Sequence, residues 1–105
     1  MVITILDAEV AENNWQALKD AYAKETVNIP EGIHQTFLIQ SQSQSSSWRI
    51  MTHWRSQEDL DHMRQTEKIP PAIRVFQAAD ATPSLEIWNI EIHRVNENND
   101  IFKFT

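Results

Sequence analysis

The fold of this chain can be worked out from residues 48–63, WRIMTHWRSQEDLDHM, where a strand pattern changes into a helix pattern. Residues 48–55 place large apolar side chains at alternate positions, which is typical of a β-strand. After them a Ser-x-x-Asp step precedes Leu60 and Met63, which share one face of a helix. We expect the Ser56 hydroxyl to cap this helix by accepting the backbone N–H of Asp59. The segment therefore predicts a strand, a capped turn and a helix.

A second strand, residues 33–40, precedes this one. The polar stretch SQSQSSS between the two strands is short enough to be a hairpin loop. We predict the antiparallel register that places apolar side chains opposite one another. Its facing pairs are Ile39 with Trp48, Phe37 with Ile50, and Ile33 with Trp54.

The N-terminal part predicts a strand followed by a helix. Residues 2–10 are mostly β-branched and apolar, as expected of a strand that is covered on both faces. From Ala11 onward, Trp15, Leu18 and Tyr22 recur at helical spacing and predict an amphipathic helix. The stretch NIPEGIH then marks a turn, because it holds a proline and the only glycine of the chain.

The C-terminal half predicts two more helical segments and a last strand. Pro70 and Pro71 must end the helix that begins after Ser56, because proline lacks an N–H and clashes with the preceding turn. They also suit the first positions of a new helix. Pro83 closes that helix, and residues 84–95 alternate as a strand. The apolar stripe of the second helix consists of Ala72, Ile73, Phe76 and Ala79.

These elements follow the order β-α-β-β-α-β of ferredoxin-like α+β domains, with a four-stranded antiparallel sheet. We expect one domain over residues 1–95, and a tail or short extra strand over residues 96–105. Helices can cover only one face of the sheet, yet the first and last strands are apolar on both faces. We therefore predict a homodimer in which the outer face of each sheet packs on the other copy.

The composition narrows the classes of partner. A net charge of −6 without a basic segment argues against nucleic acid and anionic membranes. The chain has no cysteine, which excludes disulfides and thiolate metal sites and fits a reducing compartment. The N-terminus has no basic region typical of a signal peptide, and no apolar run approaches about 20 residues. We expect a cytoplasmic protein.

The chain resembles the antibiotic biosynthesis monooxygenase family of the dimeric α+β barrel superfamily. The resemblance rests on Trp54-Arg55-Ser56 at the end of a strand, on the helix that follows, on the proline break before Phe76, and on Pro83-x-Leu85. It implies that the sheets of two subunits form a barrel, with a small pocket between the sheet and the helices of each subunit. Known members include oxygenases that act on polyphenolic or quinol-like molecules without metal or flavin, and haem-degrading relatives.

One position departs from the pattern of the family. Members often carry a histidine, and haem-degrading relatives a tryptophan, nine residues after the tryptophan that ends the third strand. That position is Met63 in this chain, and His62 lies about 100° away around the helix. We therefore do not expect haem degradation, and a histidine base at this position is missing.

Five residues are candidates for substrate binding, because they can meet between the helices and the sheet. The competing interpretation is that they are ordinary core residues. We expect no bound cofactor, since oxygenation of an electron-rich phenol needs only a base and a dry aromatic pocket. The five residues are Trp15, Tyr22, Trp54, Met63 and Phe76.

Three residues are candidates for catalysis. His34 and His53 lie opposite each other in the predicted register, where they could act as a base or bind a metal. No third metal ligand is apparent, so a polar pair at a subunit interface explains them equally well. Glu67 falls on the inward stripe of its helix, where a carboxylate is costly unless it is paired. If the helix ends before Pro70, Glu67 is simply exposed.

The leading hypothesis from the sequence is a homodimeric, cofactor-independent monooxygenase that oxidises a small aromatic, quinol or polyketide-like substrate. An alternative from another class is a non-catalytic dimeric module that binds a small hydrophobic ligand. Catalysis requires a titratable group that reaches an enclosed pocket, whereas binding requires only the enclosure. A third hypothesis, metal-dependent chemistry, predicts an ion between His34 and His53.

Overall fold

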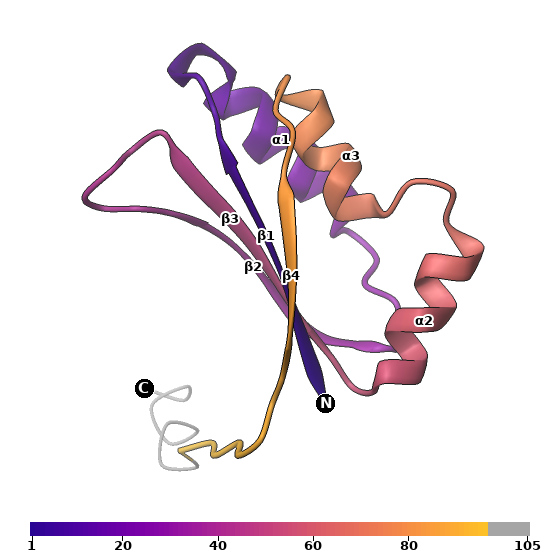
Figure 1. The fold of residues 1–105 in the computed structure, drawn as a ribbon. Helices are drawn as coiled ribbons and strands as arrows, with labels where there is room; N and C mark the ends of the chain where they lie inside the picture. Colours follow the sequence, from indigo (N-terminus) through magenta and orange to yellow (C-terminus); the bar gives the residue numbers. More distant parts are fainter. Residues whose placement is uncertain (97–105) are drawn as a thin grey trace, which may run out of the picture.

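The computed structural model describes residues 1–96 as a ferredoxin-like α+β domain. Its four strands form one antiparallel sheet in the order β2-β3-β1-β4, which confirms the predicted fold class (Figure 1). The strands are β1 (Val2–Glu9), β2 (Ile33–Gln40), β3 (Ser47–Trp54) and β4 (Ser84–Asn89).

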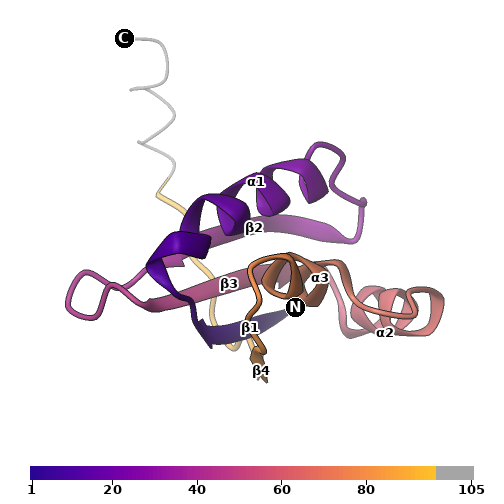
Figure 2. The same ribbon diagram turned by 90° about the horizontal axis from the view of Figure 1, so that it is seen from above.

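Three α-helices and a short 3-10 helix, η1 (Glu12–Asn14), complete the domain. The helices α1 (Trp15–Glu25) and α3 (Pro71–Ala78) pack against each other and against the sheet. The third helix, α2 (Gln57–Thr66), stands apart from this pair, as Figures 1 and 2 show. Within residues 1–96, no helix combines the length and the apolar character needed to cross a membrane.

Local sequence signals explain where α2 and α3 begin and end. The Ser56 hydroxyl accepts the backbone N–H of Asp59 at 3.1 Å, which confirms the predicted cap. The helix ends at Thr66, and Glu67 already has an extended backbone. Pro71 is the first residue of α3, where its missing N–H costs nothing. The two prolines thus separate two helices, as predicted.

The core lies between the sheet and the pair α1–α3. Leu18 and Phe76 are completely buried there, so the predicted apolar stripes of both helices face the sheet. A second, smaller cluster lies under α2. It contains Val2, Trp54 and Leu60, with Ile33 and Met63 packed against it.

The predicted register of the hairpin is right at one end and wrong at the other. Ile33 lies opposite Trp54 as expected, but the pairing then shifts between Ile33 and Gln35. Beyond this irregularity Phe37 faces Met51, and Ile39 faces Arg49. A one-residue shift moves every following side chain to the other face of the sheet. As a result Thr36 and Leu38 face the helices, whereas Phe37 and Ile39 lie on the outer face.

The outer face of the sheet carries a group of large apolar side chains that the single chain leaves uncovered. Trp88 is 56% exposed and lies opposite Ile3 of β1. Phe37 and Ile39 are also exposed. We call this surface the outer apolar face. It consists of Ile3, Ile5, Phe37, Ile39, Met51 and Trp88.

The last strand is shorter than predicted. It ends at Asn89 instead of continuing to residue 95. β1 does not continue the pairing, because its first residue, Val2, already lies opposite Asn89. The short extra strand expected near residues 100–105 lies outside the described residues.

Candidate active-site cavity

A cavity of about 270 Å³ lies between the sheet and the three α-helices. It receives side chains from all four strands and from α1, α2 and α3. Pockets for drug-sized ligands usually enclose about 300–1,000 Å³. The volume of this cavity therefore fits a small molecule of a few rings.

The walls of the cavity are mostly apolar. Trp54 and Leu60, from the cluster under α2, form the wall beneath that helix together with Met63. On the opposite side, Leu85 and Ile87 face the cavity from the edge strand β4, yet they are 46% and 40% exposed. A hydrophobic ligand in the cavity would cover them.

The floor of the cavity carries a row of hydroxyl groups. Thr36, Thr52 and Thr4 occupy facing positions on β2, β3 and β1 and line the cavity together. Tyr22 of α1 donates its hydroxyl to Thr36 Oγ1 at 3.1 Å, and Thr36 Oγ1 lies 3.3 Å from Thr52 Oγ1. The indole N–H of Trp54 donates to Thr4 Oγ1 at 3.0 Å. We call Thr4, Thr36 and Thr52 the threonine row.

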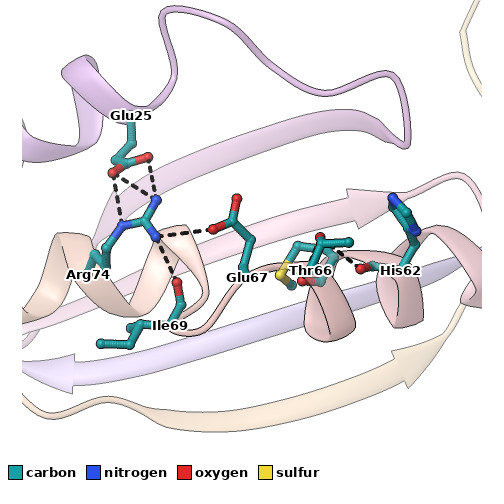
Figure 3. A network of polar contacts seen from close by, with 7 residues as sticks. Glu25, His62, Thr66, Glu67, Ile69 and Arg74 are labelled. Carbon is teal, nitrogen blue, oxygen red and sulfur yellow. Dashed lines mark hydrogen bonds and ion pairs between the residues drawn. The ribbon is translucent and has the colours of Figure 1, made fainter.

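An arginine of α3 joins the C-terminal ends of α1 and α2 at the rim of the cavity (Figure 3). Arg74 of α3 contacts both carboxylate oxygens of Glu25 at the end of α1 and lies 3.4 Å from Glu67 after α2. It also donates to the carbonyl oxygen of Ile69 at 2.8 Å. The hydrogen bond that Arg74 donates to Glu25 raises the pKa of Arg74, so the guanidinium remains charged.

Four of the predicted site residues line the cavity: Tyr22, Trp54, Met63 and Glu67. Glu67 is not buried on a helix stripe, since α2 has ended before it and its side chain is 43% exposed. Trp15 and Phe76 belong to the core instead. The Trp15 indole packs edge-on against Trp48 at 5.8 Å and donates to the carbonyl oxygen of Val10.

His34 and His53 come together, but on the outer side of the sheet and not in the cavity. Their rings are 4.9 Å apart although Gln35, not His34, is the strand partner of His53. His93 completes the cluster, with its ring 5.3 Å from that of His53. His53 is only 4% exposed, and its burial, together with the two neighbouring histidines, lowers its pKa. No group of metal-ligating side chains within residues 1–96 has a geometry suited to a metal ion.

The sequence interpretation missed the threonine row and the rim residues Glu25 and Arg74. A signal for the row was present, because Thr4, Thr36 and Thr52 each interrupt an apolar strand. The predicted register placed Thr36 on the wrong face and so concealed their alignment. The rim residues had no local signal, since they lie in separate helices and meet only in the folded chain.

A comparison with models of protein families identifies the family of this chain. Residues 1–79 match the model described as antibiotic biosynthesis monooxygenase. The chain belongs to this family. No curated protein matches the chain.

Solved structures of other proteins share the fold at low sequence identity. A protein of Deinococcus radiodurans described as an antibiotic biosynthesis monooxygenase has a TM-score of 0.68 and 15% identity, covering 91% of this chain and 97% of its own. SnoaB, a cofactor-independent oxygenase from Streptomyces nogalater, has a TM-score of 0.63 and 14% identity, covering 88% and 94%. An MhuD variant with two manganese protoporphyrin IX molecules per active site has a TM-score of 0.69 and 19% identity, covering 91% and 100%.

Proposed function

We propose that this antibiotic biosynthesis monooxygenase family member is a cofactor-independent monooxygenase that oxidises a small aromatic, quinol or polyketide-like molecule. The observation that carries the proposal is the cavity of about 270 Å³, with walls formed by Trp54, Leu60 and Met63. Such a wall excludes water and holds a flat, electron-rich ring. SnoaB, which shares the fold, is a cofactor-independent oxygenase and supports this class of reaction.

The reaction requires only the substrate, dioxygen and a proton acceptor. In a substrate of the anthrone type, a ring CH₂ group loses two hydrogen atoms and becomes a carbonyl group. One atom of dioxygen becomes the carbonyl oxygen, and the other leaves as water with the two hydrogen atoms. A base starts the reaction by removing the first proton, because the resulting anion is the species that reacts with oxygen.

Glu67 is the residue that we propose as the base. Among the three catalytic candidates from the sequence, it is the one that lines the cavity. Its carboxylate lies 3.4 Å from the guanidinium of Arg74, which holds it at the rim of the cavity. His34 and His53 lie on the other face of the sheet, so this proposal gives them no part in the reaction.

Oxygen consumption with a panel of quinols and anthrones tests the proposal. Anthrone and 1,4-dihydroxynaphthalene are supplied to the purified protein, and uptake above the uncatalysed rate is followed with an oxygen electrode. We expect one oxygen molecule to be consumed per anthrone converted to anthraquinone. Met63→Trp fills the cavity and should abolish this uptake, whereas Val27→Trp, on an exposed residue outside the cavity, should not.

The base is tested by a separate pair of variants. Glu67→Gln keeps the shape of the side chain but accepts no proton, so we expect kcat to fall at least about 100-fold. Glu58→Gln, on the exposed surface of α2, is the matched control. Equal kcat values for Glu67→Gln and the wild type would remove Glu67 from the mechanism.

A non-catalytic module that binds a small hydrophobic ligand is the second candidate function. It is favoured by the interior of the cavity, where Trp54, Leu60 and the threonine row carry no group that is charged at neutral pH. Tight ligand binding without any oxygen uptake would establish this alternative. We do not propose that this chain binds a metalloporphyrin as the MhuD variant does. No histidine of residues 1–96 lines the cavity, and Met63 occupies the family position of the histidine or tryptophan.

We also propose that the chain forms a homodimer through the outer apolar face, so that two sheets make a dimeric α+β barrel. The helices cover the opposite face, and the exposed Phe37, Ile39 and Trp88 would otherwise remain in contact with water. A second copy presents the same apolar surface and buries both. Sedimentation equilibrium measures the mass of the assembly directly.

A further inference from the structure

The threonine row contains more hydrogen-bond donors than the protein uses. Tyr22, Thr36 and Thr52 carry three hydroxyl protons in total, because each hydroxyl has one. Two hydrogen bonds join them, from Tyr22 to Thr36 and between Thr36 and Thr52. Whichever of the two threonines donates to the other, one threonine proton has no acceptor within residues 1–96. That proton belongs to a hydroxyl on the floor of the cavity.

Thr4 supplies a second unused donor. Its Oγ1 accepts the indole N–H of Trp54, which is a donor only. The Thr4 hydroxyl proton itself contacts no acceptor in the described part of the chain. Thr26 provides the contrast, since it also lines the cavity but donates its proton to the carbonyl oxygen of Tyr22 at 2.7 Å. Thr26 therefore offers no unused hydroxyl proton to the cavity, whereas the threonine row does.

When Thr36 donates to Thr52, the two unused donors are neighbours. Thr4 lies directly opposite Thr52 on the adjacent strand, and facing side chains of paired strands have Cβ atoms about 5 Å apart. An oxygen atom placed between two such hydroxyls can accept a hydrogen bond of about 2.8 Å from each. A carbonyl or phenolate oxygen has the lone pairs to accept both, whereas a hydrocarbon ring has none.

We propose that Thr4 and the Thr36–Thr52 pair bind the carbonyl or phenolate oxygen of a cyclic ligand whose apolar rings contact Trp54 and Met63. This inference rests on the proposed function and defines the class of substrate for the same site. The oxygen of the substrate then faces the threonine row, and its rings face the apolar walls of the cavity. Donors that are already in place also favour an anion, so the same hydroxyls would stabilise the phenolate or enolate formed when the base removes a proton.

Binding of two probes of the same shape tests the inference. 1-Tetralone has a carbonyl oxygen, and tetralin has a CH₂ group in its place. Dissociation constants are measured by NMR titration at one pH, and the ratio of the two constants is compared between proteins, which cancels the different solubility of the probes. The test variant is Thr36→Val/Thr52→Val, which keeps side-chain shape and removes two hydroxyls of the row. The control is Thr26→Val, whose hydroxyl is already used.

We expect the preference for 1-tetralone to fall about 5- to 10-fold in the double variant, the value of one hydrogen bond. It should remain unchanged in Thr26→Val, and thermal unfolding confirms that each variant is folded. Thr4→Val adds an independent measurement and should lower the preference as well. An unchanged preference in both row variants, with both probes still bound, overturns the donor assignment and leaves the proposed oxygenase reaction standing. If neither probe binds the wild type, both the inference and the ligand-binding cavity are wrong.

Discussion

Nη1 of Arg74 lies 3.4 Å from Oε2 of Glu67, so a residue of α3 holds the chain at the end of α2. Few other contacts restrain α2. Leu60 is its buried residue and packs against the sheet. We predict that Arg74→Met lowers the free energy of unfolding by about 1 kcal/mol or less, because the ion pairs are partly exposed. Amide hydrogen exchange should accelerate in Gln57–Thr66 far more than in the sheet.

Arg64→Met is the matched control for this prediction. Arg64 belongs to α2 but makes no ion pair within residues 1–96. Its substitution should leave amide exchange in α2 unchanged. Equal acceleration in both variants would show that Arg74 does not anchor the helix.

Replacing Trp88 tests the assembly. Trp88→Lys places a charge on the outer apolar face, where Trp88 is 56% exposed in the single chain. Because burying an unpaired charge between two sheets is costly, we expect the variant to sediment as a monomer at concentrations where the wild type is a dimer. Val27→Lys, at an apolar residue that is also exposed but lies outside this face, should remain dimeric. A wild-type protein that sediments as a monomer would remove the proposed interface.

The buried histidine predicts how stability depends on pH. Burial lowers the pKa of His53, and the positive charges that His34, His93, the N-terminal amine of Met1 and Arg55 can carry lower it further. The unfolded chain, with its usual histidine pKa of about 6.5, therefore binds the proton more readily than the folded chain. The contribution of His53 to the free energy of unfolding is therefore fully present above about pH 6.5. It is lost as the pH falls toward the lowered pKa of His53. Urea unfolding between pH 7.5 and 5.5 measures the loss.

A pair of histidine variants separates this effect from other titrations. His53→Gln should flatten the decrease in the urea midpoint between pH 7.5 and 5.5. His62→Gln, on the exposed surface of α2, should not. If both variants follow the wild-type curve, the buried histidine does not control the pH dependence.

The only glycine is required for a close approach between two segments. A Cβ atom on Gly32 would lie 2.8 Å from Cβ of Asp59, in the first turn of α2. Its φ angle is not positive, so the constraint is steric and not conformational. We predict that Gly32→Ala lowers the free energy of unfolding by about 1–3 kcal/mol, because the start of α2 must move. Chemical denaturation measures this, and Glu31→Ala, at the exposed neighbouring residue, should be nearly neutral.

Part of the site could be predicted because it follows from local spacing. The helix stripe, the strand end and the second helix predict that Tyr22, Trp54 and Met63 reach the pocket, and all three line it. Phe76 has the same kind of spacing and is completely buried in the core. Periodicity identifies the inward face of an element, but it does not say which inward residues meet another side chain and which meet a cavity.

The order of elements, the cap at Ser56, the break at Pro70 and Pro71, and the apolar stripes were determined by the sequence alone. These features depend on neighbours within one or two turns of the chain. The hairpin register, the alignment of the threonine row, and the separation of His53 from the cavity were decided only by the tertiary structure. A single irregularity after Ile33 reverses the faces of β2, and pairing between strands carries no signal within either strand. Side chains on different elements can form a site only after this long-range pairing has been made.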